Sequence, residues 1–371
     1  MTPDDTLALY ILSRSLWWRH DLEQLDAEAV AAVIAALEAA QKDIASRLAA
    51  EAAGLATLSD WRREQDEALN AWADEVLAGA RATITVTVSE ASIAAAAASL
   101  AAYNAILTLD GKASAVKSVG LTSAQIASWF QDTALGSGGL EHWVDTALDN
   151  GVKQSILAAL RQVAVEGKGT AEAVRRVLVA ASDAGFELTR REAITITRTF
   201  IQTANVNAQE AVYKANEGLF KGYKRVETLD NRTCMQCLWG DGAVYKLDEP
   251  RPRLPAHPRC RGLWVPVAKS WRDFGIDVDD LEAVARPWTI RETGPIGTGG
   301  RKIENYGKTT ENFSGWWASL SAADKAKTAI GPIRRRLLET GAVKWDDMWD
   351  KASGLPKTLE QMGYDRQGNR L

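Results

Sequence analysis

Apolar positions recur at helical spacing along the first part of the chain. From about Leu22 to Leu77 the sequence is rich in Ala, Glu and Leu and contains no proline. Within it, the apolar residues Val30, Val33, Ile34, Leu37 and Ile44 follow the period of an α-helix with one buried face. This pattern predicts long amphipathic helices.

The next stretch changes its pattern twice. Residues 82–88 alternate β-branched side chains and predict a short strand. The uncharged segment from Ala91 to Leu109 is mostly alanine but includes Ser92, Tyr103 and Asn104, which makes it a poor hydrocarbon anchor and a good packed helix. No membrane span is expected, and Thr133–Gly139 is expected to be a loop.

Three further helices are marked by start and stop signals. The first runs from about Val152 to Glu166 and ends at a Gly-Lys-Gly sequence, and the second follows the capping residue Thr170. The third is expected to open with a capping box formed by Thr189 and Glu192. It should continue to about Asn216, where Gly218 follows as a stop signal.

Strand patterns then frame a short, loop-rich segment. Phe220–Thr228 and Leu263–Val267 both predict strands, and residues 289–312 are typical of an exposed linker. After the linker, a helix start at Ser321 and the turn Gly331-Pro332 predict a compact helical module.

The predicted fold class is therefore mainly α. It comprises a long helical N-terminal region (1–135), an α-helical core with a small β flap (140–270), a linker (271–311) and a small helical C-terminal module (312–371).

Metal-binding residue types cluster inside the flap. All three cysteines of the chain lie in two short motifs, Cys234-Met-Gln-Cys237 and His257-Pro-Arg-Cys260. A gap of two residues lets both side chains of each motif turn toward one ion, and the spacer lets the second motif close the other side. Because four ligands complete a tetrahedral shell, the spacing predicts a structural Cys3His site for Zn²⁺.

Other uses of the cysteines fit less well. A redox dithiol usually opens a helix after a strand, whereas Trp239-Gly-Asp-Gly242 predicts a turn directly after the pair. A disulfide would leave one cysteine over, and Met1–Asp5 lacks the basic start of a secretory signal. The same ligand set would also suit iron.

Charge is spread unevenly along the chain. The net charge of −4 and the pI near 5.6 do not indicate a nucleic-acid binder as a whole. Residues 1–130 hold nine Lys and Arg against seventeen Asp and Glu, so the basic side chains gather later. Five arginines flank the metal motif and are candidate phosphate contacts, with a solvated face as the alternative. They are Arg232, Arg251, Arg253, Arg259 and Arg261.

Two further features bear on function. Of the three histidines only His257 lies in a motif, so no catalytic residue is predicted and the chain is expected not to be an enzyme. Polar residues repeat every four positions along the helix that precedes the flap, and we expect this stripe to dock the flap or a partner. The expected docking residues are Arg198, Thr199, Thr203 and Asn207.

An ordered series of motifs between Arg161 and Val267 resembles the phage head-morphogenesis, or Mu F-like minor head protein, family. The matching pieces are Gly167-Lys-Gly169-Thr170, Thr197-Arg198-Thr199, Thr203-Ala204-Asn205, Asn207-Ala208, Asp230-x-Arg232-Thr233-Cys234-x-x-Cys237, His257-Pro258-x-Cys260-Arg261 and the closing Val-Pro-Val strand. The C-terminal module resembles the tails of such proteins in Trp316, Gly331-Pro332-Ile333-Arg334 and Leu337-Leu338-Glu339-Thr340-Gly341. One departure is Val226, where the family often has Trp.

The resemblance implies a minor structural protein of a tailed-phage head. Such a protein would lie in the virion, in the head interior or at the portal vertex, after assembly in the host cytoplasm. Its implied partners are the portal protein, the major coat or scaffold protein and phage DNA, and its implied role is to assist head assembly and DNA packaging or ejection. No catalytic activity follows from the resemblance. The alternative is a zinc-knuckle nucleic-acid-binding protein.

Overall fold

The computed structural model of the protein describes residues 3–51, 63–131, 139–166, 184–276, 313–350 and 355–371, together with Glu172, Arg175, Arg176 and Val179. Most of the expected loop before Gly139, the motif at Gly167–Thr170 and the expected linker at 289–312 lie outside these residues. Within them the protein is mainly helical with a small sheet, as the sequence predicted.

The chain folds into two compact units built from non-consecutive segments. Unit 1 comprises Met1–Glu23, Ala96–Leu121 and Asn205–Leu371, and unit 2 comprises Gln24–Ala95 and Thr122–Ala204. The consecutive domains expected from the sequence stay a prediction, because the segments around 136 and 277–312 are outside the described residues.

Unit 2 is a helical assembly. Its helices are parts of α1 (Pro3–Glu51), α2 (Arg63–Thr108) and α7 (Ala184–Ala215), with all of α3 (Ser123–Gln131), α4 (Leu140–Leu148), the π-helix η3 (Asp149–Lys153) and α5 (Gln154–Val165). The predicted apolar face is buried: Val30, Val33 and Leu37 are at most 2% exposed. Burial of such a stripe is the main source of stability for long helices.

Residues 82–88 form part of helix α2, so the predicted strand is wrong. Ile84 and Val88 lie one helical turn apart and are both buried, and the Thr83 hydroxyl donates to the carbonyl of Gly79 on the same helix. Burying this face of the helix outweighs the intrinsic strand preference of β-branched residues, which is worth at most about 1 kcal/mol per residue.

The predicted helix start at Thr189 is also wrong, because α7 already begins at Ala184. Thr189 lies inside the helix, is buried, and donates its hydroxyl to the carbonyl of Ala147 at 3.3 Å. The Thr-x-x-Glu pattern from Thr189 to Glu192 therefore does not mark the start of a helix. The hydroxyl finds its partner on a neighbouring helix instead of at a free backbone amide.

One described helical stretch, Ala73–Thr108, is long and apolar enough to cross a membrane by length and composition alone. Of its most apolar window, 39% is buried inside the protein. Core helices of soluble proteins meet the same criterion, so the expectation of no membrane span stays a prediction.

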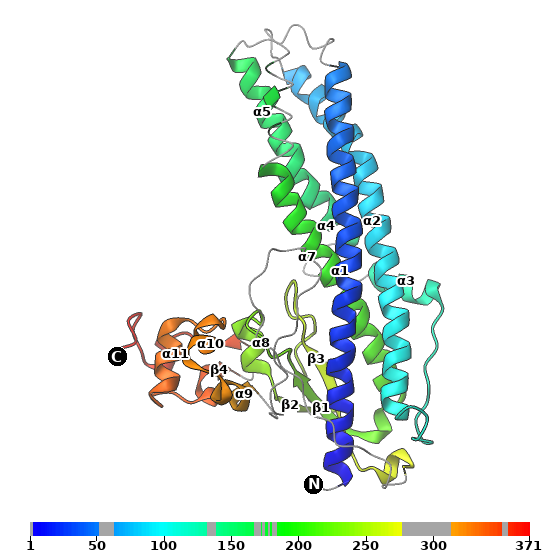
Figure 1. Cartoon of the computed structure of the whole chain (residues 1–371), viewed down its shortest axis with the longest axis vertical. Helices are drawn as coiled ribbons and strands as arrows, with labels where there is room; N and C mark the ends of the chain where they lie inside the picture. The colour runs from blue at the N-terminus through cyan, green and yellow to red at the C-terminus, as the bar shows by residue number, and fades with distance from the viewer. Residues whose placement is uncertain are drawn as a thin grey trace. The chain divides into compact units, whose positions relative to one another are not determined.

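Unit 1 is built around a three-stranded antiparallel sheet in the order β2-β1-β3 (Figure 1). Strand β1 (Phe220–Val226) and strand β3 (Leu263–Ala268) confirm the two predicted strands, whereas β2 (Val244–Lys246) was not expected. The central strand β1 pairs with both neighbours, so the sheet brings the segments before and after the metal motif side by side.

The sheet packs against the last turns of helix α7. Tyr213 packs against Phe220 and Tyr223 of β1, and the Gln209 side-chain oxygen accepts a hydrogen bond from the backbone amide of Trp264 at 3.1 Å. Helix α7 ends at Ala215 and the short helix η4 (Glu217–Leu219) follows, which agrees with the predicted end near Asn216.

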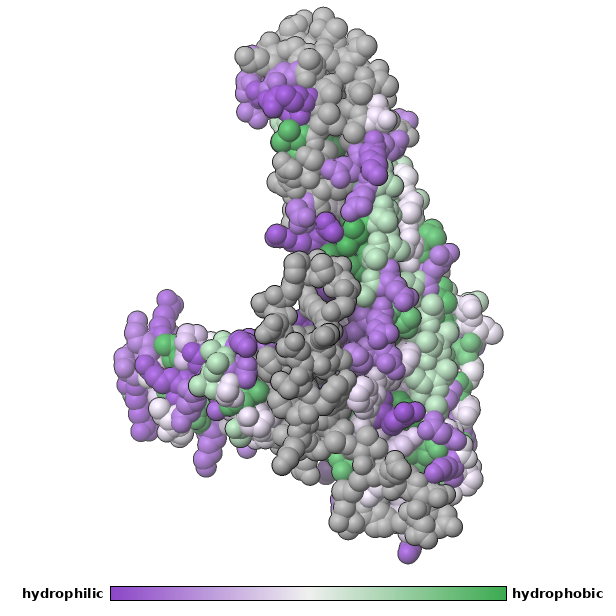
Figure 2. Space-filling model, viewed as in Figure 1, coloured by the Kyte–Doolittle hydropathy of each residue, from purple (hydrophilic) through white to green (hydrophobic). Residues whose placement is uncertain are grey.

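The C-terminal module also belongs to unit 1. It contains α9 (Phe313–Ser319), α10 (Ala322–Lys327), α11 (Pro332–Glu339), η7 (Trp345–Met348), the hairpin of β4 (Trp349–Asp350) and β5 (Leu355–Pro356), and η8 (Glu360–Met362). Ser321 caps α10 by accepting from the Asp324 amide, as predicted. On the face of the module seen in Figure 2, hydrophilic residues predominate, while Phe313, Trp316 and Trp317 are buried inside.

Gly222 in β1 lies against the backbone of Tyr245 in β2, and a methyl group at this position would overlap the Tyr245 carbonyl. We expect Gly222→Ala to force the two strands apart and to lower the free energy of unfolding by about 1–3 kcal/mol. The matched control is Gly218→Ala, where nothing lies within 4 Å of the added methyl group. Urea unfolding of both variants checks this, and equal stabilities would contradict it.

Candidate metal centre

A short helix presents the first pair of cysteines. Helix α8 spans Met235–Gly240, with Cys234 in extended conformation at its N-cap and Cys237 buried in its first turn. The sequence predicted a turn directly after the cysteines, from Trp239; instead Trp239 and Gly240 are still helical, and the turn consists of Asp241 and Gly242, where Gly242 has a φ of 85°. A helix start after a strand is also where redox dithiols occur, so the turn no longer argues against that use of the pair.

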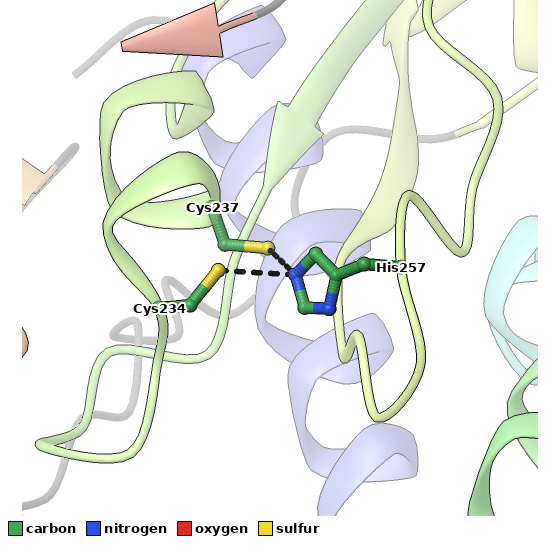
Figure 3. Close-up of side chains that lie close together, drawn as sticks. All are labelled: Cys234, Cys237 and His257. Atoms are coloured by element: carbon green, nitrogen blue, oxygen red, sulfur yellow. Dashed lines mark hydrogen bonds between the residues drawn. The ribbon is translucent and has the colours of Figure 1, made fainter. Parts of the chain in front are cut away.

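The second pair lies on the loop that leads into β3. Figure 3 shows the His257 ring reaching toward Cys234 and Cys237 from the opposite side. Its Nε2 atom lies 3.0 Å from the Cys234 Sγ and 3.2 Å from the Cys237 Sγ. The structure therefore brings together ligands that are separated by twenty or more positions in the chain.

Cys260 joins the cluster through Cys237, with a distance of 3.7 Å between their sulfur atoms. A tetrahedron with zinc–sulfur bonds of about 2.3 Å has a sulfur–sulfur edge of about 3.8 Å, so this pair fits a shared metal ion. Cys237 and Cys260 also form a buried group with Glu227, in which the donor atoms lie within 4.8 Å of one another. The four predicted ligands thus form a cluster that could hold a metal ion.

Hydrogen bonds within the cluster lower the pKa of two of the cysteines and so favour their thiolate forms. The bond from Cys237 lowers the pKa of the Cys234 thiol to about 4, and another bond from Cys237 lowers the pKa of Cys260 to about 5. Contact with Cys234 raises the pKa of His257 to about 9, and the bonds that Cys237 donates raise its own pKa. Thiolates are the form that binds metal, and an ion would displace the protons held by Cys237 and His257.

A buried ion pair that the sequence analysis missed lies next to the sulfur atoms. Arg225 Nε donates to Glu227 Oε1 at 2.7 Å, and both side chains are at most 1% exposed. A second nitrogen of Arg225, Nη2, lies 3.7 Å from the Cys237 sulfur. A donor in this position can orient a thiolate ligand and offset its charge. The sequence signal was weak, because Arg225 and Glu227 are two of four charged residues in the predicted strand Phe220–Thr228.

Two glycines make room for this pair. A methyl group on Gly240 would fall 2.7 Å from the Arg225 guanidinium, and one on Gly262 would fall 2.6 Å from the Glu227 carboxylate. Gly240 ends α8, and Gly262 follows the last ligand by two positions. Both segments that carry ligands therefore also pack directly on the buried charges.

A second charged network ties the two halves of the motif together. Arg261 donates to both carboxylate oxygens of Asp230, at 2.7 and 2.5 Å, and to the hydroxyl of Thr233 at 2.9 Å. Thr233 in turn donates to Asp230, and Arg261 also pairs with Glu23 of α1 at 3.3 Å. The polar residues that accompany the ligands in the motif thus cross-link the same two chain segments.

Most of the arginines predicted to contact nucleic acid are engaged within the chain. Arg232 and Arg261 pair with Asp230 and Glu23, and Arg251 donates to Glu210 at 2.7 Å while stacking over the ring of Tyr223. Arg253 and Arg259 are exposed. Arg232 is exposed as well, although it is paired, so three of the five predicted arginines face solvent near the metal cluster.

Two threonines of the predicted docking stripe on α7 form hydrogen bonds within the helix itself. The hydroxyls of Thr199 and Thr203 donate to carbonyls one turn earlier on the same helix, while Arg198 and Asn207 are half-buried. The hydrogen bonds that we resolve between α7 and the flap come from further along the helix, through Gln209 to β3 and Glu210 to Arg251. The docking role of the stripe stays a prediction.

Asp230 should make the stability of the protein depend on pH. Burial alone would raise its pKa, but Arg261 and Arg232 outweigh burial and lower the pKa to about 2. The ordinary value in an unfolded chain is about 3.9. A carboxyl whose pKa is lower in the folded state stabilises that state above the unfolded pKa, and this contribution is lost as the pH falls from about 4 to about 2.

We therefore expect Asp230→Asn to lower the free energy of unfolding at pH 7 by about 3 kcal/mol, because two arginines lose their buried partner. The difference from the unmodified protein should shrink as the pH falls below about 4. Urea titrations at a series of pH values measure it, with Asp248→Asn at an exposed position as the control. A variant as stable as the unmodified protein at pH 7 would show that the network contributes nothing.

No family model, no curated protein and no solved structure matches this chain. The resemblance to head-morphogenesis proteins therefore rests on the residues quoted for it.

Proposed function

We propose that Cys234, Cys237, His257 and Cys260 hold a structural zinc ion in a minor structural protein of a tailed-phage head. Three sulfur donors and one imidazole suit zinc, which favours tetrahedral sites with soft ligands. Four protein ligands leave no open position for a substrate, so the ion would stabilise the flap and take no part in chemistry.

One observation supports the link between the motif and this role best. The residues of the motif that are not ligands form a single network, in which Asp230 binds Arg261, Arg232 and Thr233. A bare pair of cysteines would need none of these partners. The part of the resemblance that surrounds the ligands, Asp230, Arg232, Thr233 and Arg261, thus consists of residues that cross-link the flap, which favours treating this segment as one unit.

The wider role follows from the resemblance. The protein would associate with the portal protein, with the major coat or scaffold protein and phage DNA as further partners, and would assist head assembly and DNA packaging or ejection. It would lie in the head interior or at the portal vertex after assembly in the host cytoplasm. A cross-linked flap in one compact unit and a mainly helical second unit fit a structural role.

Nucleic-acid binding by the zinc knuckle is the second candidate. Arg253 and Arg259 are exposed near the cluster and could contact phosphates. Three of the five arginines in the predicted set are already paired with carboxylates of the same chain. A weak electrostatic contribution is therefore all that this surface supports, and we rank nucleic-acid binding second.

Removal of one ligand should remove the metal and destabilise the flap. We expect Cys237→Ser to lose bound zinc and to lower the free energy of unfolding by about 3 kcal/mol, a shift in melting temperature of roughly 6–12 °C. Elemental analysis and thermal unfolding measure the two effects. Gln236→Ser is the matched control, because it changes the neighbouring position on α8 and keeps all four ligands. Unchanged melting of Cys237→Ser would refute a structural metal.

The assembly role can be tested by co-expression with candidate portal and coat proteins from the same genome. We expect the chain to co-purify with portal or with procapsids in a few copies per particle, and the zinc content can be measured in the same sample. A chain that binds neither partner would overturn the assembly role. Binding of that free chain to DNA, lost steeply with added salt, would then favour the second candidate.

A further inference from the structure

Helix α8 serves two clusters at once. Its Cys237 side chain lies among the metal-binding residues, while Met235, Leu238 and Trp239 belong to the hydrophobic cluster at the centre of the C-terminal module. Because successive residues point in different directions around a helix, one face of α8 meets the ligands and the next face meets the module.

The contact with the module is aromatic and well buried. Trp239 is 7% exposed, and its ring lies 4.2 Å from that of Trp345 and 6.0 Å from that of Phe313, measured between ring centres. Trp345 also packs against Trp317 at 5.5 Å. Aromatic pairs at such distances contribute about 0.5–1.5 kcal/mol each beyond the burial of their surface.

Neither helix α8 nor the C-terminal module is expected to be stable without the other. Helix α8 has six residues, and isolated helices shorter than about 12 residues are marginal in water. The module is small, and its apolar core includes four residues that the chain supplies from outside it: Leu229, Met235, Leu238 and Trp239. A small domain buries a low fraction of its surface, so the loss of several core residues weakens it strongly.

We infer that metal binding and docking of the C-terminal module, residues 313–371, are coupled through α8. An ion that joins Cys234 and Cys237 to His257 holds the helix in place, and the placed helix completes the core of the module. The inference rests on the proposed metal centre. It adds that metal binding favours the docked state, in which α8 covers the aromatic residues of the C-terminal module.

The coupling must act in both directions. If the metal strengthens docking by some factor, docking must strengthen metal binding by the same factor, because the two equilibria form one thermodynamic cycle. Changes on the apolar face of α8 should therefore weaken metal binding, although no ligand is altered. A metal that stabilised the flap alone would not show this effect.

The first measurement compares the full chain with zinc and after chelation, by hydrogen exchange of backbone amides in residues 313–350. We expect zinc removal to lower their protection by about 10-fold to 100-fold, which lies within the usual range of coupling between sites. The second measurement is zinc affinity, by competition with a chelator, in the variant Trp239→Ala. Its affinity should fall by a similar factor, while Val244→Ala, at a position 48% exposed on β2, should bind zinc normally.

The outcomes separate the inference from the proposed metal centre. Zinc that binds with unchanged protection of the module, and with normal affinity in Trp239→Ala, would overturn the coupling and leave the metal centre intact. A chain that binds no zinc would overturn both. If Trp239→Ala does not fold, the comparison of the zinc-bound and chelated natural chain still decides the question.

Discussion

The flap depends on joining two polar chain segments that have little apolar surface of their own. The first contains Asp230 to Cys237 and the second contains His257 to Arg261, and strands β1 and β3 bring their ends together. Contacts between sulfur and imidazole join the segments at one point, and the bonds from Arg261 to Asp230 join them at another. Ordering the loop-rich chain between the strands costs roughly 1–2 kcal/mol per residue, and the burial of a few side chains such as Leu238 and Trp239 offsets only part of it, so these links supply the rest.

The same solution places several charges out of contact with water. Arg225, Glu227 and Asp230 are at most 1% exposed, and removing such groups from water is expensive unless each meets an opposite charge and hydrogen bonds. Arg225 and Glu227 meet each other directly, and Gly240 and Gly262 leave the room that the guanidinium and the carboxylate occupy. A metal ion would add positive charge beside the three cysteines, so the ion and Arg225 would together offset the negative charge of the thiolates.

The sequence predicted what depends on local spacing and failed where distant contacts decide. The cluster of candidate ligands was predicted because a gap of two residues is the spacing that lets neighbouring side chains share one ion. The end of α7 and the start of α10 were found because caps and stops are local signals. The Thr189 pattern and residues 82–88 misled for the opposite reason. Their local preferences are small, and contacts with other helices, such as the bond from Thr189 to Ala147, override them.

The Arg225–Glu227 pair shows a further limit of sequence reasoning. Alternation along a strand sends residues 225 and 227 to one face, but only the fold reveals that this face is buried against α8. A charged pair at the end of a strand is usually solvated, so the residues alone favour an exposed position. What distinguishes this pair is the pair of glycines opposite it, and these come from positions 15 and more residues away.

The spacing of the first two cysteines also accounts for the way one short helix can serve two clusters. Cys234 and Cys237 occupy the N-cap and the third helical position of α8, and residues three apart lie on the same side of a helix. With the cysteines on that side, Met235, Leu238 and Trp239 lie together on the neighbouring side of the helix. The separation that suits a metal ion therefore fixes, through the helical period alone, which residues can be apolar and face the C-terminal module. A one-residue insertion between the cysteines would break both relations at once, since it would turn the second ligand away from the first and rotate Leu238 and Trp239 out of the aromatic cluster.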